Sequence, residues 1–456
     1  MRWLVSVGVV LLASCSTVDN PAFCDENADC KNGFVCNLDT NGCEAQQQPM
    51  DDAGVDASNS CTLDDECASG VCRDDSTCED AANILYVSPD GISAGMCPAD
   101  GRCDLVYALS IVSPQVSTIR LANGSYDIAS DLEVDETVTL VGGRAAVLKR
   151  SSPGAVISAV GPVGAEPTLV LRGMTSNKGI ECNRATVRLQ RVMFDNPPPE
   201  ATPWIDTLDC RLVIEQSELR DSPTSAISGE YTDLAMVDSK ISGSGIDVVG
   251  VGDGIAINRG RLGSVGISIE RSTIELNLGM GLKLSNLTSF RLERSTIINN
   301  RAGGVSAVDT SYDVTNNMIV LNGAQVSPVE FGGMRLAGSG RAIHNTITQN
   351  RAPPDALYAG GLYCDNGTAS NNIIVDNERG NEELPYAQVR GTCNFAGSIV
   401  DPSSNAAVFV DPFAGDFHLA SSSPAVNAGG TPQVGIDFDG EPRSDGAADL
   451  GADERP

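Results

Sequence analysis

The sequence predicts an all-β protein whose main body is a right-handed parallel β-helix, a solenoid of stacked coils, preceded by two small disulfide-rich modules. Three observations predict this fold class. A strand-and-turn unit recurs nine times in the main body, apolar and polar residues alternate within each copy, and two groups of four cysteines precede it. One such unit cannot bury its apolar face alone, but a stack of units can.

The first half of each repeat places an apolar residue shortly before a turn, as in SIERSTIELN, RLERSTIINN and DVTNNMIVLN. The apolar positions are Met174, Met193, Leu219, Ile241, Ile274, Ile297, Ile319, Ile347 and Ile374. The turn positions are Asn177, Asn196, Ser222, Ser244, Asn277, Asn300, Asn322, Asn350 and Asn377. Stacked strands lie about 4.8 Å apart, so nine coils predict a rod of roughly 45 Å. Equivalent asparagines should form hydrogen-bonded amide ladders, which makes them structural residues.

The second half of most repeats reads Gly-apolar-x-apolar, as in Gly281-Leu282-Lys283-Leu284 and Gly333-Met334-Arg335-Leu336. Alternation with a period of two is typical of a strand that is buried on one side only. No segment carries the spacing of three to four residues that a helical solenoid needs.

The first residues combine one basic residue, an apolar run from Trp3 to Leu12 and the tetrapeptide Leu12-Ala13-Ser14-Cys15. This order is typical of a secretory signal, which we assign to residues 1–14, and the run is too short to span a bilayer. Leu-Ala-Ser-Cys resembles the lipobox of bacterial lipoproteins, which implies cleavage before Cys15 and lipidation of that residue. Ser16 resembles the outer-membrane sorting pattern. We therefore expect lipid anchoring to the outer membrane, with the leaflet left open.

Fourteen of the fifteen cysteines remain once Cys15 is lipidated, and an even number can all pair in an oxidising compartment. Residues 15–44 contain the first module, residues 45–60 a polar acidic linker and residues 61–82 the second module. Each module allows three disulfide connectivities, which stay open, and together they predict a beaded stalk. The module cysteines are Cys24, Cys30, Cys36 and Cys43, then Cys61, Cys67, Cys72 and Cys78.

Six cysteines fall in the β-helix itself. Thr207-Leu208-Asp209-Cys210 repeats Gly179-Ile180-Glu181-Cys182 one coil later, and stacked residues lie within the distance that a disulfide spans. The same reasoning applies at the far end of the rod, and a third pair falls in the first loop. The predicted pairs are Cys182–Cys210, Cys364–Cys393 and Cys97–Cys103.

Charge excludes one class of partner. Thirty basic and sixty acidic residues give a net charge of −30, which repels the phosphate backbone of nucleic acids. We expect a solvated acidic surface.

Two segments resemble known families. The segment ILYVSPDGISAGMCPADGRCDLVYAL, followed by STIRLANGSYDI and VTLVGG, resembles the start of bacterial β-helix proteins of the pectate-lyase-like superfamily. The segments VFVDPFAGDFHLASSSPAVNAGG and DFDGEPRSDGAADLGADE resemble the tail of surface β-helix proteins of the choice-of-anchor Q type. These resemblances place the β-helix at residues 83–402 and the tail at 403–456, and imply a surface location without naming a ligand.

The resemblance raises three enzyme options: polygalacturonase-type hydrolases, pectin methylesterases and calcium-dependent pectate lyases. The segment GDGIAIN, with Asp253, matches one aspartate block of the hydrolases, but the partner aspartate and their histidine and basic segments are absent. Of the two histidines, we expect His344 to be exposed or satisfied and His418 to pack within the tail. We expect no catalytic residue and no metal site. Calcium is left open in the acidic tail, where Asp437 and Asp439 form a D-x-D-G turn and Asp445 follows.

Long insertions follow the turn residue in five coils, so they must leave the rod along one edge. Four end in or near an aromatic residue, and acidic residues accompany them: the candidate binding residues are Trp204, Phe331, Tyr358 and Tyr386, together with Asp253. Aromatic rings beside carboxylates suit sugar rings, although the same rings could pack the loops onto the rod. We expect a non-catalytic surface protein for adhesion or recognition of a polysaccharide or a partner protein. A lyase or hydrolase of acidic glycans and a purely structural envelope protein are the alternatives.

Overall fold

In a computed structural model the described residues are 60–455 without 153, 163, 199–201, 246–251, 262–265, 327, 381–384, 402–408 and 444–445, preceded by two short strands. These strands, β1 (Phe34–Asn37) and β2 (Gly42–Ala45), form an antiparallel pair in a separate compact unit of residues 1–59. Residues 60–456 form the second unit. The predicted signal peptide, Cys15 and the linker lie outside the described residues.

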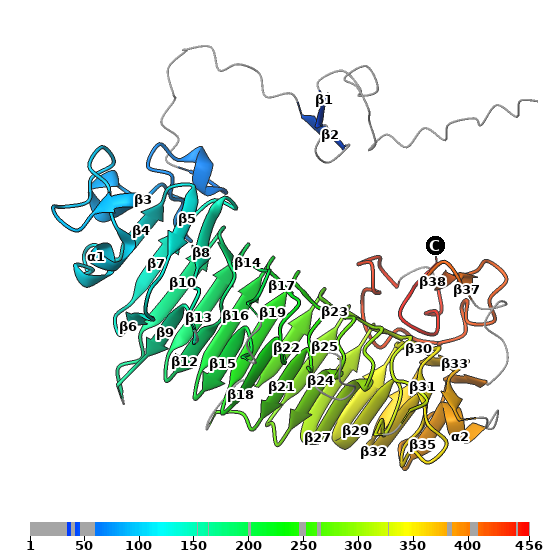
Figure 1. Cartoon of the computed structure of the whole chain (residues 1–456). Helices are drawn as coiled ribbons and strands as arrows, with labels where there is room; N and C mark the ends of the chain where they lie inside the picture. Colours follow the sequence, from blue (N-terminus) through cyan, green and yellow to red (C-terminus); the bar gives the residue numbers. More distant parts are fainter. Residues whose placement is uncertain are drawn as a thin grey trace, which may run out of the picture. The chain divides into compact units, whose positions relative to one another are not determined.

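The second unit is dominated by a parallel β-helix whose coils each contribute strands to three faces, which we name A, B and C (Figure 1). Face C is a sheet of twelve parallel strands, three more than the nine repeats that the sequence predicts. Its strands are β5 (Gly124–Asp127), β8 (Ala146–Lys149), β11 (Thr175–Ser176), β14 (Met193–Phe194), β17 (Glu218–Arg220), β20 (Lys240–Ser242), β23 (Thr273–Glu275), β26 (Thr296–Ile298), β28 (Met318–Val320), β30 (Thr346–Thr348), β33 (Ile373–Val375) and β36 (Ile399–Asp401).

Face A follows face C along the chain, and each of its strands pairs in parallel with the strand one coil away. Three long strands turn the corner from face A into face B. The strands of face A are β6 (Leu132–Val134), β9 (Ile157–Val160), β12 (Ile180–Asn183), β15 (Ile205–Leu208), β18 (Ile227–Glu230), β21 (Ile255–Asn258), β24 (Met280–Ser285), the first halves of β27 (Gly303–Thr315), β29 (Met334–Ile343) and β32 (Leu362–Ser370), and β35 (Val389–Gly391).

Face B completes each coil. Its strands are β3 (Ile84–Ile92), β4 (Thr118–Leu121), β7 (Val138–Val141), β10 (Thr168–Arg172), β13 (Thr186–Gln190), β16 (Arg211–Glu215), β19 (Asp233–Val237), β22 (Ile267–Glu270), β25 (Phe290–Glu293) and the second halves of β27, β29 and β32. The turns from face B to face C stay tight throughout the rod, whereas the connections from C to A carry the insertions. The insertions therefore leave the rod along one edge, as the sequence predicts.

The strong repeats have the predicted register. Leu219, Ile241, Ile274 and the four isoleucines that follow stack directly on face C. The two weakest copies are out of register. Phe194, not Met193, pairs with Leu219, and Thr175 rather than Met174 pairs with Met193.

The predicted amide ladder runs from Asn277 through Asn300, Asn322 and Asn350 to Asn377, where Gln388 ends it. Each side-chain oxygen also accepts the backbone N–H of the preceding member. Ser222 and Ser244 occupy equivalent positions without an amide. Asn177 and Asn196 lie outside the ladder, because their copies are out of register, and Asn196 is exposed.

A second ladder, which the sequence analysis did not interpret, follows the turn from face B to face C. In each step a buried side-chain oxygen accepts the backbone N–H of the residue one coil earlier. Its members are Ser217, Ser239, Ser272, Ser295, Asn317, Asn345, Asn372 and Ser398. Two buried polar ladders thus fix the register of the coils.

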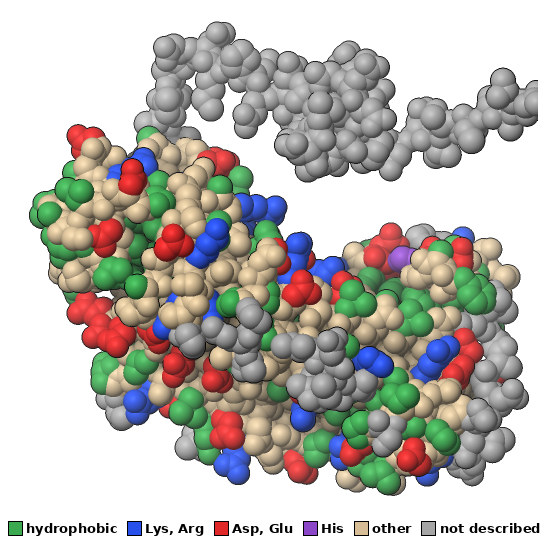
Figure 2. All heavy atoms as spheres, viewed as in Figure 1, with side chains coloured by type: hydrophobic (Ala, Val, Ile, Leu, Met, Phe, Trp, Pro, Cys, Tyr) green, Lys and Arg blue, Asp and Glu red, His purple; other side chains and the backbone are tan. Residues whose placement is uncertain are grey.

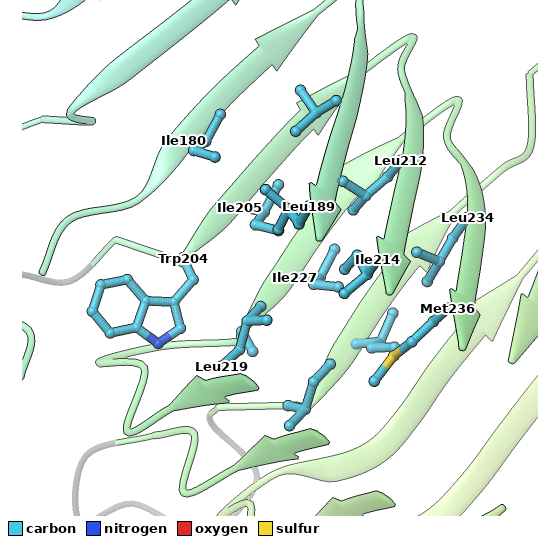
Figure 3. Close-up of a cluster of buried hydrophobic side chains, with 14 of the residues drawn as sticks. Ile180, Leu189, Trp204, Ile205, Leu212, Ile214, Leu219, Ile227, Leu234 and Met236 are labelled. Atoms are coloured by element: carbon cyan, nitrogen blue, oxygen red, sulfur yellow. The ribbon is translucent and has the colours of Figure 1, made fainter. Parts of the chain in front are cut away.

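Inward side chains of all three faces fill the rod (Figure 3). Ile205 and Ile227 come from face A, Leu212 and Leu234 from face B, and Leu219 from face C, and all are buried. This is the apolar interior that period-two alternation predicts.

The N-terminal end of the rod is covered by the loop of the Cys97–Cys103 disulfide and by α1 (Leu105–Ser110), whose buried face is Leu105 and Ala108. Both predicted inter-coil disulfides are also present, Cys182–Cys210 and Cys364–Cys393. The register assumed for the first is wrong: Cys182 pairs with Thr207, so Cys210 lies three residues past the stacked position.

The second cysteine module packs on the rod and is not a free bead of a stalk. Its disulfides are Cys61–Cys72 and Cys67–Cys78. Asp64 forms ion pairs with Arg172 and Arg191 of face B, at 3.2 Å each, and Asp74 forms pairs with Arg172 and Arg188, at 2.9 Å each. The module therefore covers the N-terminal part of face B.

The C-terminal tail covers the far end of face C (Figure 1). Phe409, Phe417 and Leu419, from the hairpin of β37 (Phe409–Asp411) and β38 (Asp416–Leu419), pack with Met318, Val320, Ile373 and Val375 of face C. Arg443 is fully buried, pairs with Glu454 at 2.7 Å and donates to the Asn316 side chain of the rod at 3.1 Å. The tail is thus integral to the fold.

Among the residues that the structure describes, no helix is both long and apolar enough to cross a membrane.

Candidate functional site

Face A is the face that neither the second module nor the tail covers in the described part of the chain. The module lies on face B and the tail on face C. Outward side chains of consecutive face A strands stand side by side in register: Asp206, Ser228, Ala256, Lys283, Ser306, Arg335, Tyr363 and Arg390. On the side of the molecule that Figure 2 shows, acidic and basic side chains are interspersed.

A groove lies in the middle of face A, over β15, β18, β21 and β24, with a cavity of about 480 Å³. Its floor is made of small residues, Ser228, Gly229 and Ala256. A Cβ on Gly229 would lie 1.7 Å from the Thr207 hydroxyl, so a glycine is required there. The charged and polar side chains that line the cavity are Asp206, Glu230, Asn258, Lys283 and Ser285.

Carboxylates dominate the N-terminal half of the groove. Asp206 stacks on Glu181 of the neighbouring strand, and partial desolvation raises the pKa of Asp206 above its usual value. Lys283 lies across the floor from it, 3.8 Å from a carboxylate oxygen of Asp253. Hydroxyl groups of a ligand would meet both hydrogen-bond acceptors and a cation in this groove.

Two tyrosines and an arginine form a cluster on β29, β32 and the loop between them. The guanidinium of Arg335 lies 4.2 Å from the ring centre of Tyr358, whose ring packs edge-on against Tyr363 with centres 4.6 Å apart. The Tyr363 hydroxyl donates to Asp365, and this bond raises the pKa of Tyr363 to about 12. All three side chains are partly exposed. We refer to Arg335, Tyr358 and Tyr363 as the Arg–Tyr cluster.

The insertions beside this cluster form a layered wall. Tyr358 N donates to the Glu330 carbonyl at 3.2 Å, and Arg351 forms an ion pair with Glu378 at 3.3 Å. The short strands β31 (Arg351–Ala352) and β34 (Glu378–Arg379) pair in parallel within it. Leu357 is exposed on this wall. Hydrogen bonds between successive loops therefore hold the edge of face A in one arrangement.

Two of the predicted binding aromatics are core residues. Trp204 is 2% exposed, packs on Phe194 with ring centres 5.4 Å apart and donates its Nε1 proton to the Arg220 carbonyl (Figure 3). Phe331 is fully buried against Gly303. The loops that end in Trp204 and Phe331 each fold over the ring, which fills the corner between faces C and A. Neither ring is available to a ligand.

The other predicted binding residues have different outcomes. Tyr358 lies on face A in the Arg–Tyr cluster. Asp253 is buried, accepts a hydrogen bond from Met280 N at 2.7 Å and does not line the cavity, and burial raises its pKa. The side chain of Tyr386 lies outside the described residues.

Five residues of face A were not identified as candidates from the sequence: Asp206, Glu230, Lys283, Arg335 and Tyr363. A signal was present for two of them, because Lys283 and Arg335 fill the polar position of Gly-apolar-x-apolar, which must point outward from the rod. Asp206, Glu230 and Tyr363 could be identified only once it was known which strands of the rod neither the second module nor the tail covers.

His344 is fully buried, with Nδ1 3.1 Å from the Asp449 carbonyl and Nε2 accepting a hydrogen bond from Asn371. Both ring nitrogens therefore have partners, which is one of the two environments that the sequence predicts for this residue. Burial, aided by Arg443, lowers the pKa of His344 to about 3. His418 does not pack in the tail, since its side chain is 47% exposed and contacts Asp416 and Asp439. Neither ring lies in the groove.

The predicted calcium residues do not present a free set of ligands. Asp437 is fully buried, and its oxygens accept the backbone N–H groups of Glu441 and Glu454. Asp445 lies outside the described residues. Asp439 is exposed beside His418.

No protein-family model matches this chain, and no curated protein matches it. Solved structures that resemble it include pectate lyase Pel9A, at 16% identity over 82% of this chain and 96% of that chain, with a TM-score of 0.38. PfbA, a surface adhesin of Streptococcus pneumoniae, is 9% identical over 69% and 92% of the two chains, with a TM-score of 0.37. A PL6 alginate lyase is 12% identical over 72% and 87%, with a TM-score of 0.34. At these values the likenesses identify no ligand and no activity for this chain.

Proposed function

We propose that this chain is a lipid-anchored protein of the bacterial outer membrane that recognises a polysaccharide along face A without cleaving it. One observation carries the proposal. In the described part of the chain neither the second module nor the tail covers face A, and this face combines a polar groove, the Arg–Tyr cluster and a wall of ordered insertions along one edge.

The chemistry of face A suits a sugar chain laid across the strands. Tyrosine rings offer flat apolar surfaces for stacking, and a guanidinium offers several donors in a fixed plane. The carboxylates of Asp206 and Glu230 accept hydrogen bonds from hydroxyl groups. Successive strands lie about 4.8 Å apart, so a chain parallel to the rod axis would meet a new set of side chains at each strand.

The anchor is supported by the sequence alone. Leu12-Ala13-Ser14-Cys15 follows an apolar run that is too short to span a bilayer. Several acyl chains on Cys15 would hold the protein at a membrane, because each buried methylene contributes about 0.8 kcal/mol. Cys15→Ala should release the protein from the membrane fraction. An unchanged membrane fraction for this variant would contradict the anchor.

Binding is tested by titrating the full chain with a panel of soluble polysaccharides. With each stacked ring contributing on the order of 1 kcal/mol, Tyr358→Ala combined with Tyr363→Ala should weaken binding by about tenfold or more. Tyr231→Ala is the matched control, because Tyr231 also lies under an arginine, Arg259, but at the opposite edge of face A. Equal losses in both variants, or binding to no member of the panel, would overturn the proposal.

A lyase is the second candidate function, and the arrangement in the groove favours it over a hydrolase. Calcium-dependent lyases of the resembled superfamily need acidic residues on neighbouring strands with a nearby basic residue as base. Glu181, Asp206 and Glu230 lie on three neighbouring strands, and Lys283 lines the same cavity as Asp206 and Glu230. Release of unsaturated sugar ends from a uronate polymer with calcium present, lost in Lys283→Ala, would establish cleavage and refute the non-catalytic assignment.

A further inference from the structure

Three side chains meet at the surface of the tail, far from face A along the chain. They are His418 on β38, Asp439 in the D-x-D-G turn and Asp453 near the end of the chain. One ring nitrogen and two carboxylate oxygens from these residues lie within 4.8 Å of one another. In Figure 2 a histidine is visible at the surface of the C-terminal part, among acidic side chains.

The contacts of the imidazole define the orientation of its two nitrogens. Nδ1 of His418 lies 2.7 Å from Oδ1 of Asp416, and a carboxylate can only accept, so Nδ1 carries the proton of that bond. Nε2 lies 3.2 Å from Oδ2 of Asp439. In the neutral tautomer that Asp416 selects, Nε2 and this oxygen are two facing acceptors. Such a pair requires a positive charge between them, which is either a second proton or a metal ion.

We propose that Nε2 of His418 and the carboxylates of Asp439 and Asp453 bind a divalent metal ion of the zinc class. Imidazole nitrogen with carboxylate oxygen suits zinc, and two ligands of a tetrahedral zinc ion lie about 3.3 Å apart. The 3.2 Å between His418 and Asp439 matches this separation. Asp416 lies behind the ring, where a carboxylate typically fixes the orientation of a metal-binding histidine.

The local charge favours a cation at this point. Asp416, Asp439 and Asp453 surround a single imidazole. Asp453 is 7% exposed, and one of its oxygens accepts the Leu419 N–H at 2.7 Å. His418 and Asp439 remain 47% and 42% exposed, which leaves room for a water as fourth ligand. The bound ion would tie the β37–β38 hairpin to the end of the chain. This inference does not depend on the proposed function.

The composition of the chain makes the site directly observable. Only two histidines exist, His418 and the buried His344. The full chain, produced without a histidine tag and labelled with nitrogen-15 in histidine, is titrated with zinc chloride at neutral pH. The ring nitrogens of His418 should shift with one equivalent of zinc, while those of His344 stay in place. Unmoved His418 signals in excess zinc would overturn the proposal.

Substitutions distinguish the proposed metal ligands from the residues around them. His418→Gln and Asp439→Asn should abolish zinc binding in calorimetric titrations, and Asp416→Asn should weaken it by about 10- to 100-fold. Glu441→Gln is the control, because Glu441 is an exposed carboxylate two residues from Asp439, and it should bind zinc like the parent. Unchanged His344 signals verify that each variant folds. Zinc retained by His418→Gln, or calcium bound in preference to zinc, would overturn the assignment.

Discussion

Removing one rung of the buried amide ladder tests whether the ladder stabilises the β-helix. The side-chain oxygen of Asn322 accepts the backbone and side-chain N–H groups of Asn300, and its nitrogen donates to the carbonyls of Ile297 and Val320 and to Asn350. Alanine would leave the buried N–H of Asn300 without an acceptor, at about 1–3 kcal/mol, and would remove two bonds to carbonyls worth about 1 kcal/mol each. Asn322→Ala should therefore lower the free energy of unfolding by about 3–5 kcal/mol.

Urea denaturation followed by far-ultraviolet circular dichroism measures the loss. Asn183→Ala is the matched control, because Asn183 lies on a strand of the same rod but outside the ladder and is partly exposed, and this change should alter stability by less than about 0.5 kcal/mol. Asn322→Ser should fall between the two, since a serine hydroxyl can still accept the Asn300 N–H, as serines do in the second ladder. Equal midpoints for Asn322→Ala and Asn183→Ala would refute the reasoning.

Three further predictions concern the core, the tail and the pH dependence of stability. Trp204→Ala should lower the free energy of unfolding by about 3–5 kcal/mol in urea titrations and leave polysaccharide affinity unchanged, because the ring plugs the core. Arg443→Ala leaves Glu454 buried without its partner, so it should destabilise by about 3–5 kcal/mol and make residues 409–455 sensitive to limited proteolysis. The pKa of His344 is about 3 in the folded chain and 6.5 in its ordinary state, so stability should fall as the pH drops from 6.5 towards 3, and His344→Gln should reduce that fall in urea titrations at several pH values.

The register of the repeat could be predicted in the seven copies from Leu219 onward. It was wrong in the two earlier copies, where a methionine precedes the true inward residue, which is Ser176 or Phe194. In the copy around Met174, the strand of face C is only two residues long and its inward position is Ser176, which is buried and donates to the Lys178 carbonyl. Gly173, with φ of 71°, is the turn residue of this copy, and it lies three residues before Ser176, as Arg271 lies three residues before Ile274. A pattern of apolar residues therefore selects Met174, although the buried position two residues later is polar.

The Cys182–Cys210 disulfide was predicted correctly, although the strand register from which it was predicted was wrong. Cys210 follows Asp209, whose φ of 56° turns the chain back towards the preceding coil. The Cα atoms of Cys182 and Cys210 end 6.2 Å apart, within the range that a disulfide tolerates. Three residues of extended strand would span about 10 Å, so it is the turn at Asp209 that brings Cys210 back within reach of Cys182.

The covering elements could not be predicted, because their contacts join residues that are distant in the sequence. Arg172 and Asp64 are separated by 108 residues, and Arg443 and Asn316 by 127. Each contact depends on one buried arginine with no local pattern around it. The prediction that the insertions present their aromatic rings to a ligand was wrong for Trp204 and Phe331 for a related reason. The sequence shows that a ring ends a loop, but not whether the loop folds over the ring.

The positions of the insertions now bear on function independently of the aromatic residues. Connections from face B to face C are tight turns that the serine and asparagine ladder holds, so an insertion there would break a buried network. The connections from face C to face A begin with the residue of the first ladder and carry the long loops after it, including the segments 323–333 and 378–387 that follow Asn322 and Asn377. An insertion placed after the ladder residue leaves the ladder intact, but this does not explain why the loops around Tyr358 bond to one another and border the face that the cysteine module and the tail leave open. A wall built beside an uncovered groove is the arrangement expected of a binding surface, and it would have no use in a rod that serves only as a spacer.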